Sequence, residues 1–346
     1  MRGVPALAVL VVALVAGACG SAGTSRTVTP AATTVPTTGG GAPATTTAAR
    51  PTTTTRPTTT GGPAAPTTIA PGAPAVGAAA PCAGRPAPAT YAHVLVIVME
   101  NHGYTDVAAH SPYLNRLASQ CGLATNYRAV AHPSLPNYIA LTSGGTQGIA
   151  DDCTACSTGA TSIFQQVGAD GWKSYEEDLP SAGYTGAASG TYAKKHDPAA
   201  YYTAIAGAFA TRAVPMGTPT AGALADDLAH DTLPKFGFLT PNLCNDEHDC
   251  GIATGDAWLS TWVPKILGSP AYAAGGTALF VTYDEDDTTG GNRVYTVAVA
   301  ASVIAGTSSD AAFDHYSLLA TMDDMLGLGR LGSAGGATSM RLALHL

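Results

Sequence analysis

The stretch His93–Asn101 has the sequence H-V-L-V-I-V-M-E-N and contains the clearest strand signal in the chain. The run from His93 to Met99 is apolar and rich in β-branched residues, which is typical of a central strand buried on both faces of a parallel sheet. It ends abruptly at Glu100 and Asn101. Functional residues of open α/β sheets collect just beyond the carboxyl ends of the strands. This carboxylate and this amide are therefore candidate site residues, with an ordinary polar loop as the alternative.

Two later strands end in the same way. Phe236–Thr240 is followed by a polar segment that contains Asp246 and His248, and Ala278–Tyr283 is followed by Asp284–Asp287. The remaining expected elements are strands at Trp172–Tyr175 and Val294–Ile304 and helices at Ser111–Cys121, Thr161–Gly168, Asp256–Leu267 and His315–Leu326. This alternation predicts a three-layer α/β/α sandwich with a mostly parallel sheet. The polar clusters would then converge on one edge of the sheet, here called the carboxyl edge.

The stretch Ala131–Gly144 (A-H-P-S-L-P-N-Y-I-A-L-T-S-G) places Ser134 at the start of another predicted helix. Serine is a preferred N-cap, and Pro136 is tolerated in the first turn because its missing N–H has no partner inside the helix. The free N–H groups and the helix dipole favour an anion at this end. Ser134 is therefore either an ordinary cap or a nucleophile for phosphorus whose phosphoryl oxygens the helix end holds. The stretch alone favours the cap, and the carboxylates elsewhere favour the nucleophile.

Composition divides the 346 residues into three segments. Residues 1–18 contain one basic residue and a long apolar run, which predicts a secretory signal peptide. The sequence A-G-A-C that ends at Cys19 is similar to a lipoprotein signal, in which a lipid on the cysteine would anchor the chain to the outer face of the membrane. Ala16 stands where leucine is usual, so plain secretion is an equal alternative. Residues 19–80, rich in Thr, Pro and Ala, predict a disordered linker, and residues 81–346 predict one catalytic domain.

The predicted domain is strongly acidic. All 24 acidic residues lie in it, whereas four of the 16 basic residues precede it, which leaves 12 basic residues and a net charge of about −12. Such a surface argues against nucleic acid as a partner. An anionic substrate would need a local positive source, such as a metal ion or a helix end.

Six cysteines follow Cys19, and an even number in an exported domain predicts three disulfides. Of the 15 possible pairings we expect Cys82–Cys121, Cys153–Cys156 and Cys244–Cys250. The C-x-x-C pair at Cys153 and Cys156 is also compatible with a redox motif, but no strand precedes it and no apolar helix follows it.

Carboxylates, an amide and histidines, with no cluster of cysteine ligands, suit a divalent metal bound through oxygen and imidazole. Carboxylates crowded at one edge repel each other, and a cation relieves that repulsion. A metal beside a serine at a helix N-terminus favours phosphoryl transfer, because the metal lowers the pKa of the serine and histidines protonate the leaving group.

Six ordered motifs make the chain resemble the phosphoesterase family of bacterial phospholipases C and secreted acid phosphatases, within the alkaline-phosphatase-like superfamily. The small acid phosphatases of mycobacterial type are most similar. The motifs are V-I-V-M-E-N (96–101), H-P-S-L-P-N-Y (132–138), Y-A-K-K-H-D-P (192–198), P-N-L-C-N-D-E-H-D (241–249), T-Y-D-E-D-D (282–287) and H-Y-S-L-L-A-T (315–321).

The resemblance implies a role for each matching residue. Ser134 would be the nucleophile, Asn137 would contact a phosphate oxygen, and the metal ligands would be Glu100, Asn101, Asp284 and Glu285. His196, His248 and His315 would bind phosphate or act as acid and base, with Asp246 assisting. The two-zinc ligand pattern of alkaline phosphatases is absent from the sequence, so the resemblance implies a single divalent metal of open identity.

Three functions compete at this point. The first is an exported phosphatase for phosphate monoesters, the second a phosphodiesterase of phospholipase C type, and the third a surface binding protein with a decayed site. Lys194 and Lys195 fit a solvated loop, and His132 either positions the loop before Ser134 or touches substrate.

Overall fold

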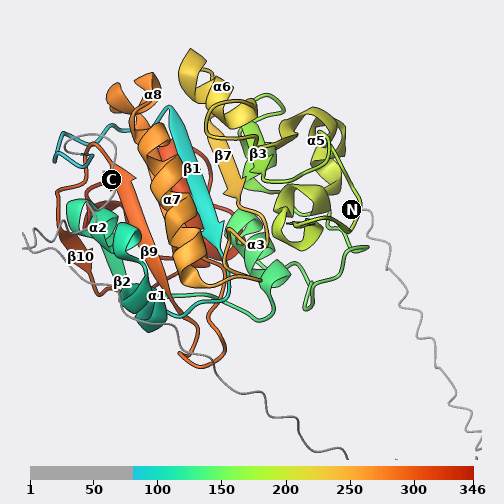
Figure 1. Cartoon of the computed structure of the whole chain (residues 1–346), viewed down its shortest axis with the longest axis horizontal. Helices are drawn as coiled ribbons and strands as arrows, with labels where there is room; N and C mark the ends of the chain where they lie inside the picture. Colours follow the sequence, from blue (N-terminus) through green and yellow to red (C-terminus); the bar gives the residue numbers. More distant parts are fainter. Residues whose placement is uncertain (1–80) are drawn as a thin grey trace, which may run out of the picture. The chain divides into compact units, whose positions relative to one another are not determined.

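The structure is a computed structural model that describes residues 81–346 (Figure 1). The predicted signal peptide, the lipidation of Cys19 and the linker lie outside the described residues. The main sheet has the strand order β10-β2-β9-β8-β1-β7-β3-β6, with β11 paired to β2. A two-stranded sheet of β4 (Ala188–Ser189) and β5 (Tyr192–Ala193) lies apart from it.

The apolar strand that opened the sequence analysis is the centre of this sheet. β1 (His93–Met99) pairs in parallel with β7 (Phe236–Thr240) on one side and with β8 (Thr277–Tyr283) on the other. Every residue of β7 and β8 is buried, as is every residue of β1 after His93. The interpretation of continuous apolar runs as strands buried on both faces is confirmed.

The other strands extend the sheet on both sides. On the β7 side lie β3 (Trp172–Glu176) and β6 (Ala213–Pro215). On the β8 side lie β9 (Arg293–Ala300), β2 (Gly122–Arg128), β10 (Thr307–Ser309) and β11 (Phe313–Asp314). Only β9 runs antiparallel to its neighbours in this sheet. The prediction of a mostly parallel sheet is confirmed.

Helices cover both faces of the sheet and complete the three layers. In Figure 1, α7 lies on the near face of the sheet, alongside β1. It packs against α2, whereas α3 packs against α9. The α-helices are α1 (Tyr104–His110), α2 (Pro112–Gln120), α3 (Ser134–Ser143), α4 (Ile163–Gln166), α5 (Ala206–Arg212), α6 (Ala223–His230), α7 (Ile252–Leu267), α8 (Pro270–Ala273), α9 (His315–Leu326) and α10 (Arg341–Leu344).

The structure differs from the expected elements at β2 and at the limits of several others, such as α7, which begins at Ile252 rather than at Asp256. β2 was not expected, because its sequence G-L-A-T-N-Y-R has a polar middle and alternates only partly between buried and half-buried positions. The strand expected at Val294–Ile304 ends at Ala300, because residues 301–302 turn away from the sheet. Strand limits are set by pairing with β8 and β2, which the local sequence does not contain.

All three expected disulfides are present. Cys82 bonds to Cys121 and so ties the segment before β1 to the end of α2. Cys153 bonds to Cys156, and Cys244 bonds to Cys250 across the loop that follows β7. The C-x-x-C pair is thus a cross-link within a loop, in agreement with the structural interpretation.

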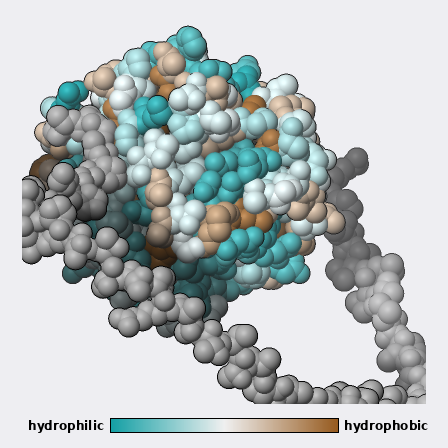
Figure 2. Space-filling view, in the orientation of Figure 1, coloured by the Kyte–Doolittle hydropathy of each residue, from teal (hydrophilic) through white to brown (hydrophobic). Residues whose placement is uncertain are grey.

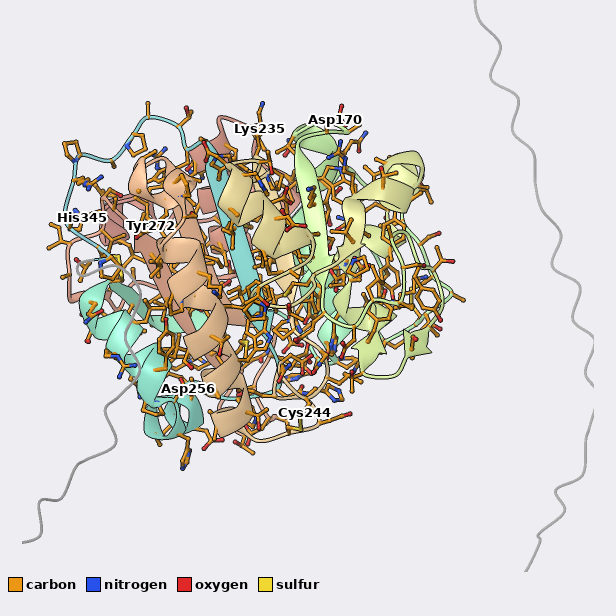
Figure 3. The ribbon with its side chains drawn as sticks, turned by 45° about the horizontal axis from the view of Figure 1, so that its top comes forward. Asp170, Lys235, Cys244, Asp256, Tyr272 and His345 are labelled. Carbon is orange, nitrogen blue, oxygen red and sulfur yellow. A yellow bond between two sulfur atoms is a disulfide. The ribbon has the colours of Figure 1, made fainter. Side chains whose placement is uncertain are left out.

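The two ends of β7 mark the two edges of the sheet. In Figure 3, Lys235, which precedes β7, and Cys244, which follows it, lie at opposite ends of the domain. On the face shown in Figure 2, apolar residues form small spots among hydrophilic ones. None of the helices within residues 81–346 combines the length and the apolar character needed to cross a bilayer.

Asp323 on α9 is a buried carboxyl group outside the carboxyl edge, and it makes the stability of the domain depend on pH. Its side chain is buried, its Oδ2 accepts the N–H of Leu331 at 3.2 Å, and its Oδ1 has no hydrogen-bond partner. Burial raises the pKa of Asp323 to about 7. The folded state therefore holds a proton that the unfolded chain releases above its ordinary pKa, so this stabilisation is complete below about pH 4 and is lost as the pH rises to about 7.

We expect Asp323→Asn to raise the melting temperature at pH 8 by roughly 2–5 °C and to change it little at pH 4. The amide keeps an acceptor for Leu331 and carries no charge to bury. Thermal unfolding followed by circular dichroism at both pH values measures the effect. Asp310→Asn, at an exposed position, is the control and should leave both values unchanged. An equal shift at both pH values would contradict this account.

Candidate active site

The sheet order brings together the polar clusters that follow β7, β1 and β8. The backbone N–H of Glu100 donates to the carbonyl of Asp246 at 2.8 Å, and the N–H of Asp284 donates to the carbonyl of Met99 at 2.9 Å. The three strand ends are therefore bonded to one another at the carboxyl edge. The predicted convergence of these clusters is present in the structure.

Glu100 is the fully buried centre of the site, and α3 is bonded to it by two hydroxyl groups. The Oγ of Ser134 donates to Oε2 of Glu100 at 3.1 Å, and the hydroxyl of Tyr138 donates to Oε1 at 2.5 Å. Ser134 and Tyr138 are four residues apart, so they project from the same face of the helix. Ser134 lies at the helix N-terminus as expected, but its side chain does not cap the helix.

The N-terminus of α3 is capped by a residue that the sequence analysis did not single out. Asp152 Oδ1 accepts the backbone N–H of Leu135 at 3.0 Å. The position before the helix is occupied by Pro133, which makes no side-chain cap. The Ser134 hydroxyl is therefore free of the capping role and points to the carboxylate cluster instead.

His196 lies between two of the site carboxylates. Its Nε2 is 3.1 Å from Oε1 of Glu100, and its Nδ1 is 3.1 Å from Oδ2 of Asp246. Its ring stacks on that of Tyr138 with the centroids 5.4 Å apart. Burial, followed by the charges of Lys195 and His248, lowers the pKa of His196 well below its ordinary value. A buried neutral imidazole is suited to metal binding.

The donor atoms of the site fit a divalent metal. Glu100, His196 and His248 each offer one ligand atom, and these atoms lie within 4.8 Å of one another. Within the site, His196 Nε2, Asp246 Oδ2 and Asp284 Oδ2 are buried and make no hydrogen bond of acceptable geometry among the described residues, although the first two have the 3.1 Å contacts given above. Unsatisfied buried polar atoms are costly, and a cation would pair with all three.

The electrostatics agree with this assignment. Burial, followed by the charges of Asp284 and Asp246, raises the pKa of Glu100 well above its ordinary value. Burial likewise raises the pKa of Asp284 and of Asp246 to about 7, and burial with the charge of Asp284 raises the pKa of Glu285 to about 8. Each shift reports the cost of several negative charges in a small dry volume, which a bound cation would remove.

Two further predicted ligands lie beside this cluster. The N–H of Asn101 donates to Oδ1 of Asp284 at 3.2 Å, and Asn101 has a φ of 59°, a conformation that asparagine tolerates better than most residues. Glu285 Oε2 is 2.9 Å from Nδ1 of His132. His132 therefore contacts a site carboxylate, a role that differs from the two interpretations left open for it.

The role expected for Asn137 needs correction. Its Oδ1 accepts the N–H groups of Val130 and Ala131 at 3.1 and 2.9 Å, and its Nδ2 donates to the carbonyl of Ala131 and to Glu285 Oε2. The side chain is buried and fully engaged. Asn137 thus holds the loop before Ser134 and has no free donor for a phosphate oxygen.

The role expected for His315 needs correction too. Its Nε2 lies 2.7 Å from the carbonyl of Asp284, which can only accept, so Nε2 holds the proton. Its Nδ1 then accepts from the hydroxyl of Tyr127 at 2.9 Å. Both nitrogens are occupied and the ring is fully buried. His315 fixes the backbone of a site residue and is not placed to bind phosphate or to exchange protons with substrate.

Lys195, expected as part of a solvated loop, lies in the site instead. Its Nζ donates to Oδ2 of Asp152 at 3.0 Å and is 3.0 Å from Nε2 of His248. Lys194 fits neither the site nor free solvent, since its Nζ donates to the carbonyl of Thr154 and lies over the ring of Tyr201. The sequence offered no signal that separates these two neighbouring lysines.

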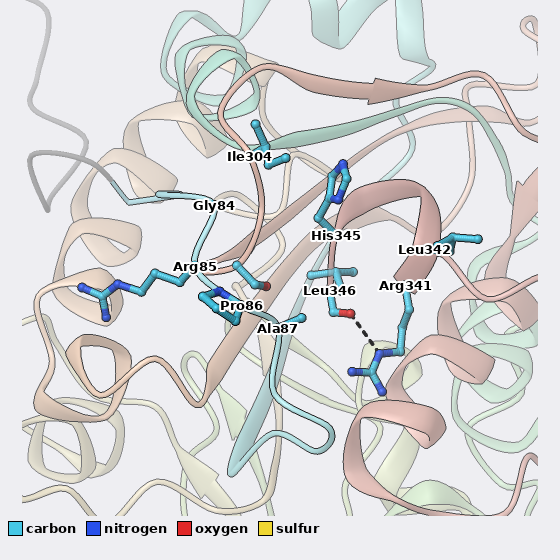
Figure 4. A pocket seen from close by; sticks show the side chains of 10 residues that line it. Gly84, Arg85, Pro86, Ala87, Ile304, Arg341, Leu342, His345 and Leu346 are labelled. Carbon is cyan, nitrogen blue, oxygen red and sulfur yellow. Dashed lines mark hydrogen bonds between the residues drawn. The ribbon is translucent and has the colours of Figure 1, made fainter.

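The groove in Figure 4 is a different feature from the candidate site. It measures about 500 Å³, and its lining includes Ile304, Leu342 and Arg341. Arg341 is already bonded to backbone carbonyls, including that of Leu346 at 3.1 Å. None of the predicted site residues lines this groove.

A serine hydroxyl bonded to a buried carboxylate cluster, at the carboxyl edge of an α/β/α sandwich, is compatible with metal-assisted transfer of a phosphoryl group. The chain belongs to the phosphoesterase family, whose sequence model matches residues 98–329. This match covers the end of β1, all of α3, β7 and β8, and the loops that follow these strands, which together build the site.

The relatives of known name that the chain resembles in sequence are phosphatases. A phosphatidylinositol-3-phosphatase of Mycobacterium tuberculosis is 33% identical over 257 residues, which are 72% of this chain and 81% of that protein. An acid phosphatase of Aspergillus fumigatus is 32% identical over 68% of this chain, which spans only 54% of that protein. Among solved structures, a 2-O GAG sulfatase has a TM-score of 0.50 at 10% identity, over 74% of each chain, which supports the fold alone. A Vibrio parahaemolyticus protein of the alkaline phosphatase superfamily has a TM-score of 0.49 at 12% identity, over 73% of this chain and 70% of that one.

A divalent cation should stabilise the protein through this cluster. We expect at least one of Mg²⁺, Mn²⁺, Ca²⁺ and Zn²⁺ to raise the melting temperature at pH 7.5, with a stabilisation of about 2.7 kcal/mol at one hundred times its Kd. The shift should shrink at pH 4.5, because carboxylates with raised pKa values then hold protons that compete with the metal. Differential scanning fluorimetry after dialysis against a chelator measures both.

Glu100→Gln should abolish the cation shift, whereas Asp310→Asn at an exposed position should keep it. A shift of equal size in Glu100→Gln and in the unsubstituted protein would place the cation somewhere else.

Proposed function

We propose that the protein is an exported phosphatase of the acid phosphatase type, which hydrolyses phosphate monoesters with Ser134 as nucleophile. The observation that supports this most directly is the Ser134 Oγ, which donates to Glu100 Oε2 at 3.1 Å instead of capping its helix. The names of the relatives support a phosphatase over a diesterase.

The proposed ligands of a divalent metal are Glu100, Asn101, Asp284 and Glu285, and the unpaired atoms of His196 and Asp246 add two further donors. When bound, such a metal lowers the pKa of the serine hydroxyl and neutralises charge on the phosphoryl oxygens. The remaining steps belong to the side chains of the chain itself.

The hydrogen bond to Glu100 indicates where the serine proton goes. As Oγ forms a bond to phosphorus, the proton of the hydroxyl passes to Glu100 Oε2, and the bond between phosphorus and the ester oxygen breaks. The leaving oxygen takes a proton from solvent, because Nε2 of His248, whose side chain is 26% exposed, already accepts an N–H of Lys195, and His196 and His315 are almost completely buried. The backbone N–H of His248 is held by Asp246 Oδ1 at 2.8 Å. Water then attacks phosphorus and gives up a proton to solvent, the bond between phosphorus and Oγ breaks, and Oγ takes its proton back from Glu100 Oε2, which releases inorganic phosphate.

Three disulfides in the described domain are typical of proteins that fold in an oxidising compartment. They support export, with the protein either secreted or held at the outer face of the membrane by a lipid on Cys19. The alternative activity is that of a phospholipase C, which would cleave a phosphodiester with the same serine.

We expect the purified protein to hydrolyse p-nitrophenyl phosphate and Ser134→Ala to lose at least ~10³-fold in kcat, since the nucleophile is removed. Ser143→Ala is a matched control, because Ser143 is a buried serine at the other end of α3 whose Oγ donates to the carbonyl of Ile139. It should retain activity within about 3-fold. Assays with both variants across pH, with circular dichroism as a check on folding, measure this.

Each other outcome has a meaning. Full activity in Ser134→Ala would exclude serine as the nucleophile. Hydrolysis of a phosphatidylcholine analogue in preference to p-nitrophenyl phosphate would favour the phospholipase C alternative. A folded protein that hydrolyses neither would favour a binding protein with a decayed site.

A further inference from the structure

The helix end that the sequence analysis expected to hold the phosphoryl oxygens is already occupied. Asp152 accepts the N–H of Leu135, and Pro136 has no N–H to offer. Of the first three residues of α3, only Ser134 keeps a free backbone N–H among the described residues. A carboxylate now stands where an anionic substrate was expected, so the positive charge for substrate binding has to come from another group.

The need for positive charge is large at this edge. Five acidic side chains lie within one network of contacts: Glu100, Asp152, Asp246, Asp284 and Glu285. One divalent cation would leave this network negative, and a phosphate monoester brings up to two further negative charges. Electrostatic complementarity therefore requires a cation supplied by the protein.

Among the lysines and arginines of residues 81–346, Lys195 is the one whose side chain forms hydrogen bonds within the site. Its side chain is 20% exposed, so the ammonium is largely withdrawn from solvent yet still reachable from it. One N–H donates to Asp152 Oδ2 at 3.0 Å, and a second reaches Nε2 of His248 at the same distance. An ammonium has three N–H groups, and the third has no acceptor among the described residues.

The contacts of Lys195 hold that third N–H in place. Asp152 is fixed by the N–H of Leu135, and His248 is fixed by Asp249, whose Oδ1 lies 2.7 Å from its Nδ1. The ammonium is thus tied to α3 on one side and to the loop after β7 on the other. It lies between the loop residue that caps the helix bearing Ser134 and the exposed histidine of the site, His248.

We infer that Lys195 binds a non-bridging oxygen of the phosphoryl group and makes the site selective for monoesters over diesters. This inference rests on the proposed function and names the group that selects the substrate class. In phosphoryl transfer, negative charge is spread over the equatorial oxygens, and fixed cations placed there stabilise the transition state. A monoester has three non-bridging oxygens and up to two charges, whereas a diester has two such oxygens and one charge. A fixed ammonium therefore gains more from the monoester.

The neighbouring residue offers a matched control. Lys194 has the same charge, but its ammonium contacts Thr154 and Tyr201. We expect Lys195→Met to lower kcat/KM for p-nitrophenyl phosphate by on the order of 10²–10³-fold, the cost of one lost transition-state donor. The same change should lower kcat/KM for bis(p-nitrophenyl) phosphate by roughly 10-fold or less. Lys195→Arg should recover part of the loss, and Lys194→Met should stay within about 3-fold of the unsubstituted protein on both substrates.

A binding measurement keeps this test separate from that of the proposed function. Inorganic phosphate, titrated calorimetrically into the cation-loaded protein, should bind at least ~10-fold more weakly to Lys195→Met. Equal losses on the two substrates, or an unchanged phosphate affinity in a folded Lys195→Met, would overturn the inference and leave Lys195 as a support for Asp152. If the unsubstituted protein hydrolyses neither substrate, the proposed function fails, and the phosphate affinities of the two variants still decide the role of Lys195.

Discussion

The burial of the Glu100 carboxylate at the end of β1 is the constraint on which the site depends. A carboxylate in a dry interior must be neutralised or must accept strong hydrogen bonds. Both oxygens of Glu100 accept a hydrogen bond from a hydroxyl group on α3. That requirement fixes the helix against the strand and aims Ser134 at the cluster. These two hydrogen bonds hold the helix in place and also set the proposed nucleophile beside its proton acceptor. Local stability and the proposed chemistry therefore depend on the same contacts.

The rest of the carboxyl edge is organised to tolerate negative charge. Some carboxylates are satisfied by backbone donors: Asp286 accepts the N–H groups of Thr288, Gly290 and Asn292, and Asp256 caps α2 at Tyr113 and Leu114. Asp246 and Asp284 each keep one oxygen without a partner. The difference separates carboxylates that hold loops from carboxylates that are available to a cation, although both kinds occur in the same short acidic runs of sequence.

The sequence predicts the central strands, the three disulfides and the convergence of the polar clusters, because each depends on local composition or on the simple rule that parallel strands share an edge. It does not predict where a side chain points. Asn137 and His315 match family motifs, yet both are fully used in holding backbone, and Lys195 differs from Lys194 only through contacts with Asp152 and His248. Those partners lie 43 and 53 residues away in the chain, so only the fold reveals them.

The strand order has a consequence for when activity can arise. β1 pairs with β7 and β8, which follow it in the chain only after β2, α3 and the whole β3–β6 region. Pairing between strands far apart in the chain costs loop-closure entropy before the stabilising contacts form. The central strands therefore assemble late in folding. During synthesis, Glu100 and Ser134 emerge long before Asp246 and Asp284. The complete site therefore does not exist until most of the domain has been synthesised, so a partly made chain has no active hydrolase site.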